Sequence, residues 1–144
     1  MVSTHGTKRN EVITQLKTKI KEIDYFKDVV FKSYKTKVVA PRVVLIHLVN
    51  DTTIDRTTNE NIHKLTINIL VKLISDLSAD QESEMESFID KVGLVEDKLF
   101  GIQNNEPYWE DLLISNVNYI FGQDKSVIWY NSLITLEVRK EWEV

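Results

Sequence analysis

Two histidines stand where a metal ion could be bound. His47 and His63 lie in apolar segments that favour neighbouring strands, and Asp51, Asp55 and Glu60 come between them in the sequence. Imidazole nitrogens and carboxylate oxygens are ligands that zinc and related metals accept. The chain has no His-x-His pair or other close ligand spacing, however, and a histidine on a half-buried strand usually serves as a hydrogen-bonded polar side chain. We therefore expect no metal site.

A run of acids offers a second kind of chemistry. The group consists of Asp80, Glu82, Glu84, Glu86 and Asp90. General acid–base catalysis needs two carboxylates held in different environments. These acids fall early in a predicted helix, on the face away from Phe88 and Val92, where the helix dipole favours negative charge. Because a solvated cluster accounts for them, we expect no catalytic residues here.

Other motifs of catalysis and ligand binding are missing from the sequence. With four glycines the chain has no Gly-rich phosphate loop, and it has no Gly-x-Ser-x-Gly elbow. The absence of cysteine removes thiol catalysis, disulfides and cysteine-ligated zinc. The lysines of the first 41 residues are scattered and not interleaved with aromatic residues, so they do not indicate nucleic-acid reading. We expect no cofactor.

Charge is distributed unevenly along the 144 residues. Residues 1–41 carry nine Lys or Arg and four Asp or Glu, whereas residues 76–111 carry two lysines and eleven acids, within a net charge of −4. Opposite charges of this kind either complement each other between neighbouring copies of the chain or form two solvated faces. The sequence leaves both interpretations open.

Tryptophans and tyrosines are concentrated toward the end of the sequence. Both are favoured anchors at protein interfaces because they combine a large apolar surface with a polar group. Trp129 and Trp142 fall near the polar register or the end of the last predicted strand. They either anchor a neighbouring protein or pack in the core and the hairpin, and exposure of Trp142 in the isolated chain would favour the interface.

Two amphipathic helices are predicted to position these residues. In residues 7–23 apolar side chains recur at steps of three and four, and Thr7 is the expected N-cap. The second helix follows a capping box at 78–81 and stops at Gly101, with Gly93 as a possible kink. Its expected core stripe consists of Met85, Phe88, Ile89, Val92, Val95 and Leu99.

The remaining segments favour strands. Residues 29–31 predict a short strand, the apolar run 43–49 a central strand, and the alternation in 61–74 a strand with one buried and one polar face. The polar residues 50–60 form either an exposed loop or the tip of a long hairpin, and two further strands within 112–138 form a closing hairpin.

These elements predict an α+β fold with a mixed, mainly antiparallel sheet of four to five strands and two main helices packed on one face. We expect residues 1–144 to form a single domain, since no linker or repeat divides them. No stretch approaches the ~20 apolar residues of a membrane span, and the amino terminus lacks a secretory pattern. We therefore expect a soluble, intracellular protein without membrane contact.

The order of elements resembles the tail terminator proteins of long-tailed bacteriophages, also called minor tail protein U or tail completion proteins. The matching features are the first helix, the proline-led strand 41–45, the alternating strand 63–73, the helix 80–99 after its acidic start, and the aromatic, acidic end of the hairpin at 134–143. The likeness covers almost the whole chain, in order, spacing and size, without a diagnostic motif.

The resemblance implies a structural virion protein without catalysis. Such a protein forms a ring, a hexamer in this family, that seats on the last ring of tail tube protein and stops tube growth. Its other face joins the head-side connector or stopper protein, and genomic DNA passes through the channel without sequence-specific binding. The resemblance thus places the chain in the neck of a virion that is assembled in the host cytoplasm.

Contacts between copies are expected where opposite charges meet and where an exposed segment reaches a neighbour. The candidates are Lys17, Lys21, Lys32, Lys35, Lys37, Asp55, Arg56, Glu82, Glu84, Glu86 and Trp142. Two other functions stay open. One is another neck or head-completion protein, and the other is a cone-shaped α+β ligand-binding domain or enzyme, which would need a deep polar pocket near His47, His63 or Asp55.

Overall fold

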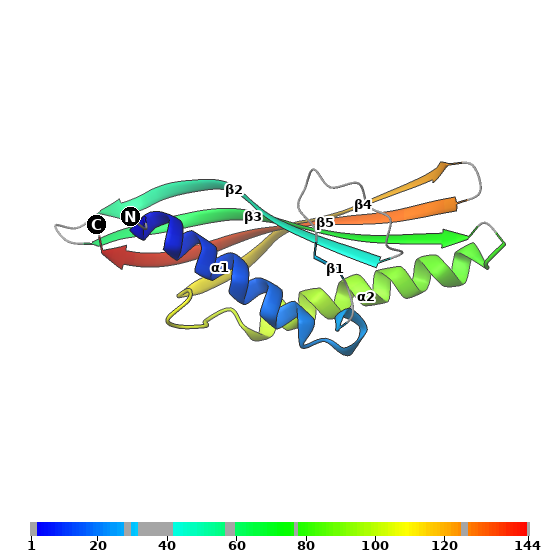
Figure 1. Cartoon of the computed structure of the whole chain (residues 1–144), viewed down its shortest axis with the longest axis horizontal. Coiled ribbons are helices and arrows are strands. Elements are labelled where there is room, and N and C mark those ends of the chain that lie inside the picture. The colour runs from blue at the N-terminus through cyan, green and yellow to red at the C-terminus, as the bar shows by residue number, and fades with distance from the viewer. Residues whose placement is uncertain are drawn as a thin grey trace.

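The computed structural model describes residues 3–27, 30–31, 42–56, 60–76, 78–124 and 127–143. Two α-helices, a short 3-10 helix and five strands follow one another in these ranges (Figure 1). In chain order they are α1 (Thr4–Lys21), η1 (Asp24–Phe26), β1 (Val30–Phe31), β2 (Arg42–Arg56), β3 (Glu60–Asp76), α2 (Gln81–Gly101), β4 (Asp111–Asp124) and β5 (Val127–Glu143).

The strands form one sheet in the order β1-β2-β3-β5-β4. β2 and β3 are an antiparallel hairpin, as are β4 and β5, and the two hairpins join through the antiparallel β3–β5 pair. The two-residue β1 lies parallel to β2 through Val30 opposite Val43 and Phe31 opposite Val44. The predicted α+β class with a mixed, mainly antiparallel sheet is therefore confirmed.

The polar segment around residue 50 is part of a long hairpin and not a separate loop. The β2–β3 ladder continues to Arg56 opposite Asn61, near the end of the elongated molecule where the N-terminus and the C-terminus also lie (Figure 1). The ladder shifts its register between Leu48 and Asn50 and again between Thr53 and Asp55. Each such bulge adds a residue to one strand and reverses the faces of the residues that follow.

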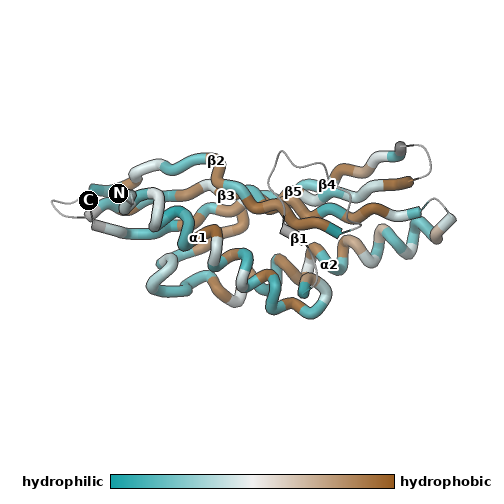
Figure 2. The backbone as a smooth tube through the Cα atoms, in the orientation of Figure 1, coloured by the Kyte–Doolittle hydropathy of each residue, from teal (hydrophilic) through white to brown (hydrophobic). Residues whose placement is uncertain are grey.

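Alternation along the strands produces the core. Buried side chains of β3 and β5 recur every second residue and join one cluster with the buried stripes of both helices. Figure 2 shows hydrophobic residues gathered along the middle of the sheet and on the adjoining helix turns. The central members are Val12, Leu16 and Ile20 of α1, Phe88, Val92, Val95 and Leu99 of α2, and Leu65, Ile67, Ile69, Ile134, Leu136 and Val138 of the sheet.

Both helices begin at residues other than the predicted ones. Ser3 caps α1 by accepting a hydrogen bond from the Gly6 amide on its side-chain oxygen, so the helix starts before Thr7. Asp80, not Ser78, caps α2, because its carboxylate accepts from the second and third amides of the helix. In the described ranges neither helix is long and apolar enough to cross a membrane.

The core stripe of α2 is narrower than predicted. Met85 and Ile89 were expected inside, but they are 38% and 46% exposed, while Phe88 is buried. The stripe repeats at Phe88, Val92, Val95 and Leu99, so Met85 and Ile89 fall to one side of it. The helix continues through Gly93 and ends at Gly101.

Candidate functional site

Exposed hydrophobic side chains are concentrated on two neighbouring elements, α2 and β4. Phe100 is 71% exposed and Ile120 is 56% exposed, although both are large and apolar. We call this region the α2–β4 surface. Its exposed members are Met85, Ile89 and Phe100 on the helix and Leu113, Tyr119, Ile120 and Phe121 on the strand.

Ring contacts join the two halves of the α2–β4 surface. Phe88 of α2 meets Tyr119 of β4 edge to face, with centroids 6.3 Å apart, and Phe121 lies beyond Tyr119 at 6.5 Å. Burial raises the pKa of Tyr119, and the carboxylate of Glu96 raises it further. The side of α2 that carries Glu96 and Ile89 therefore faces β4.

β4 is an edge strand with apolar residues on both faces. In the described ranges it pairs with β5 alone. Leu113 and Ile120 stand opposite Glu137 and Asn131, on the polar sheet face, whereas Tyr119 and Phe121 lie on the other face. Exposed edges of this length are usually shielded by charge or by a partner, and contiguous apolar patches mark interaction sites. The α2–β4 surface has the chemistry of a protein–protein contact.

The three predicted acidic contacts occupy two different environments. Glu82 and Glu86 are exposed on α2 and lie within or beside the α2–β4 surface. Glu84 is half-buried and close enough to Tyr25 and Tyr130 to raise the pKa of both phenols, which burial already raises. Glu84 therefore faces η1 and the sheet of its own chain.

The predicted basic contacts are only partly described. Lys17 and Lys21 are exposed on α1, whereas Lys32, Lys35 and Lys37 lie outside the described residues.

The two helices are linked within the chain, because the Lys98 ammonium lies 2.6 Å from the Glu22 carboxylate and lowers the pKa of that carboxyl group.

Trp142, a predicted contact, is buried within its own chain. It is 4% exposed, its ring stacks on His63, and its indole nitrogen donates to Nδ1 of His5 over 2.9 Å. The strand register explains this burial, because Trp142 lies on the same face of β5 as the buried Val138. We therefore do not retain Trp142 as a contact residue. Asp55 and Arg56 remain exposed at the end of β2.

His47 and His63 lie on opposite faces of the sheet and do not form a common site. His47 stands opposite Asn68 on the polar face, whereas His63 is on the core face, where Asp51 accepts from its Nδ1 over 2.7 Å. Arg9 of α1 donates from Nε to the other oxygen of Asp51 over 2.8 Å, and its Nη2 lies 2.8 Å from the same oxygen in an ion pair. In the part of the chain that the structure describes, no group of three His, Asp or Glu side chains could hold a metal ion.

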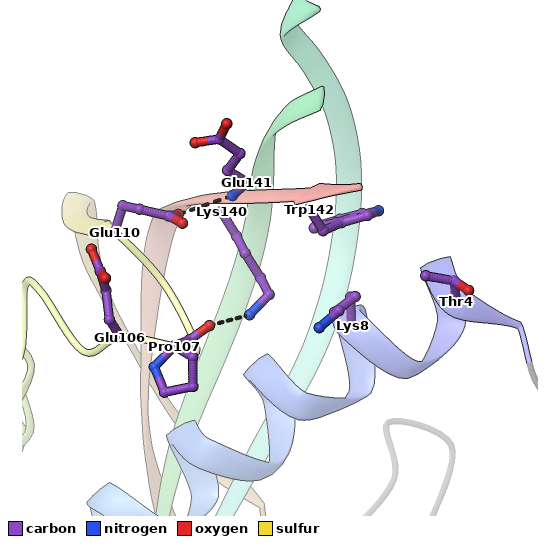
Figure 3. A pocket seen from close by; sticks show the side chains of 8 residues that line it. All are labelled: Thr4, Lys8, Glu106, Pro107, Glu110, Lys140, Glu141 and Trp142. Atoms are coloured by element: carbon purple, nitrogen blue, oxygen red, sulfur yellow. Dashed lines mark hydrogen bonds between the residues drawn. The ribbon is translucent and has the colours of Figure 1, made fainter. Parts of the chain in front are cut away.

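A groove of about 420 Å³ lies between the start of α1, the segment before β4 and the end of β5 (Figure 3). Lys140 in its wall is 1% exposed, which is unusual for lysine. Its ammonium donates to the carbonyls of Pro107 and Tyr108, both over 2.7 Å, and lies 4.0 Å from Glu11. These hydrogen bonds link the segment before β4 to β5. Because the protons of the Lys140 ammonium are engaged by the two carbonyls, Lys140 is not a nucleophile poised for catalysis.

Comparison with known proteins finds likenesses among solved structures. No protein-family model matches the chain, and no curated protein matches it. The chain is similar to a chain of a structure described as "Virion of native gene transfer agent (GTA) particle", with 11% sequence identity and a TM-score of 0.44. The match covers 83% of this chain and 84% of that chain.

Proposed function

We propose that this chain is a structural virion subunit that forms a ring at the head-proximal end of a phage-type tail. In this role it terminates polymerisation of the tail tube and provides the joining surface for the head connector or stopper protein. Genomic DNA passes through the ring without sequence-specific binding. The role requires no catalysis.

The α2–β4 surface is the observation that carries the proposal. A contact with a second copy removes side chains such as Phe100 and Ile120 from water, at roughly 25 cal/mol for each Å² of apolar area. A ring closes when one surface of the molecule binds a different surface of the next copy. The acids Glu82 and Glu86 beside the α2–β4 surface and the exposed Lys17 and Lys21 of α1 provide such a pair of unlike surfaces.

The order of elements gives a second line of support. A first helix, a proline-led strand, a strictly alternating strand, an acidic-start helix and a closing hairpin are the features on which the resemblance to the tail terminator family rests, and the described elements follow this order. The ring number and the partners on its two sides belong to the proposal.

Electron microscopy and light scattering of the purified chain test the proposal. We expect rings with a central channel, and Ile89→Lys should reduce them to smaller species. Ser87→Lys is the matched control, because it adds the same charge on the other side of the buried Phe88, away from Ile89. A chain that stays monomeric alone and with tail tubes would refute the ring. Binding to connectors but not to tubes would instead favour another neck protein.

A further inference from the structure

A second cavity, of about 370 Å³, lies beside Trp142 and is lined by side chains from three elements. α1 supplies His5 and Arg9, the end of β2 supplies Thr53 and Arg56, and β3 supplies Asn61 and His63. All six side chains are polar, and four of them are basic. Among the described residues, the lining contains no carboxylate.

Asp51 fixes two of these basic groups from behind the cavity. Its side chain is 10% exposed, and its two oxygens are occupied by His63 Nδ1 and by the Arg9 guanidinium. Both Arg9 contacts use one edge of the guanidinium, so the remaining Nη1 group is available to a ligand. Arg56 has no ion pair within the described ranges, although the Asp55 carboxylate accepts from its backbone amide. Among the described lining residues and Asp51 behind them, two arginines therefore stand against one carboxylate.

The hydrogen bond of Trp142 fixes the tautomer of His5. An indole N–H can only donate, so His5 Nδ1 must accept and the His5 proton lies on Nε2. His5 therefore offers a donor besides those of the arginines and Thr53. The cavity combines a surplus of positive charge with several donors, which is the combination that binds oxyanions.

Two buried atoms of the lining residues also lack partners. Asn61 Oδ1 and His63 Nε2 have no hydrogen bond within the described ranges. The His63 side chain is 6% exposed and Asn61 is 9% exposed. Both atoms are acceptors, Asn61 Oδ1 by its chemistry and His63 Nε2 because the Nδ1 proton is donated to Asp51, so the partner that suits them is a protonated phosphate oxygen and not an ionised one.

We propose that this cavity is a binding site for a phosphate oxyanion, held by the donors of Arg9, Arg56, His5 and Thr53. Guanidinium groups match phosphate because their planar N–H groups meet two oxygens at once. The phosphate is either free in solution or part of a nucleic-acid backbone. The site belongs to the single chain and does not depend on ring formation.

Histidine NMR of the full chain tests the site directly. Sodium phosphate is titrated at constant pH, with sodium chloride at matched ionic strength as the reference, and the imidazole nitrogen signals are followed. His5 and His63 should shift and saturate. His47 should not shift, because it lies on the opposite face of the sheet and serves as an internal control.

Arg56→Met removes one charged donor from an exposed position, so the fold should survive. Phosphate binding should weaken roughly tenfold, as expected for one charge-assisted hydrogen bond. Arg139→Met is the matched control, since Arg139 is exposed on the polar sheet face, opposite Lys64. The phosphate affinity of Arg139→Met should equal that of the wild type.

A short single-stranded DNA separates the two sources of phosphate. If DNA saturates the histidine shifts at a lower concentration of phosphate groups than inorganic phosphate does, the ligand is the nucleic-acid backbone. If only inorganic phosphate saturates the shifts, the ligand is the free ion. Three results would overturn the proposal, whether or not the chain forms rings. They are histidine signals that never saturate, a His47 signal that shifts as much as those of His5 and His63, and a phosphate affinity of Arg56→Met equal to that of the wild type.

Discussion

The indole ring of Trp142 lies nearly parallel to the imidazole of His63, with 3.6 Å between the ring centroids and 9° between the planes. Trp142 also donates to His5, and His63 donates to Asp51, which binds Arg9. These contacts join the last strand, the β2–β3 hairpin and the first helix at one end of the sheet. They explain why a tryptophan so near the end of the chain is buried.

Removal of the Trp142 ring should destabilise the protein strongly. We expect Trp142→Ala to lower the free energy of unfolding by about 3 kcal/mol, because a large buried aromatic group leaves a cavity. Trp142→Phe keeps a ring against His63 and should cost less, losing mainly the hydrogen bond to His5. Urea unfolding of the three proteins measures both effects. Equal losses for the two variants would show that stacking is unimportant.

Two glycines should respond oppositely to alanine. A Cβ at Gly122 of β4 would lie 1.9 Å from the Trp129 ring, so Gly122→Ala must displace that ring and should cost about 1–3 kcal/mol. A Cβ at Gly93 meets nothing within 4 Å, and Gly93→Ala should stabilise α2 by about 0.5–1 kcal/mol. Thermal unfolding measures both changes. A neutral Gly122→Ala would contradict the close approach of Trp129.

Lys140 should be important for stability although it is charged and buried. Lys140→Met leaves the carbonyls of Pro107 and Tyr108 without their donor, which should cost about 1–3 kcal/mol. Urea unfolding at neutral pH measures the loss. Lys64→Met serves as the control, because Lys64 is half-exposed and its ion pair with Glu137 spans 3.9 Å. We expect that control to change little.

The same lysine should give stability a defined pH dependence. Burial lowers the pKa of Lys140 from 10.5, although the nearby Glu11 acts against this shift. Between the lowered value and 10.5 the unfolded chain binds more protons than the folded chain, so the contribution of Lys140 to stability rises with pH. The unfolding free energy of the wild type should therefore rise relative to Lys140→Met as the pH increases toward 10.5. A relative decrease would show that the folded protein raises this pKa.

Association between copies should depend on the exposed acids of α2. Glu82→Lys and Glu86→Lys, singly and together, should weaken assembly at moderate salt, because they place positive charge where a basic surface is expected to bind. The difference from the wild type should shrink at high salt, where exposed charges are screened. Light scattering at two salt concentrations measures the effect. Asp24→Lys makes the same charge change outside α2 and should assemble normally.

Alternation made much of the fold predictable. The period of two in β3 placed Leu65, Ile67 and Ile69 on one face, and the structure buries all three. The same period extends through Val138 to Lys140, but a lysine is rarely buried without specific acceptors. Those acceptors are carbonyls in the segment before β4, and local pattern does not reveal their position.

The Asp51–His63 contact could not be predicted for a different reason. Simple alternation from Leu48 would place Asp51 on the polar face, away from His63. The bulge between Leu48 and Asn50 reverses the faces, so that Asp51 stands opposite Leu65 on the core face. The basic cavity depends on this bulge and on the second one, between Thr53 and Asp55, which returns Arg56 to the core face opposite Asn61. The exposure of Ile89 was likewise missed, because the helical period does not say where the sheet ends.

The strand order has a consequence for how the chain acquires its structure. Each hairpin joins neighbouring segments, whereas the central β3–β5 pair joins strands that are separated by α2 and β4. Contacts between distant segments form slowly, because a long stretch of chain must first be ordered. During synthesis on the ribosome, β3 must wait for β5, because α2 and β4 emerge between the two strands. Until β5 arrives, β3 presents an unpaired edge that is open to association with other chains.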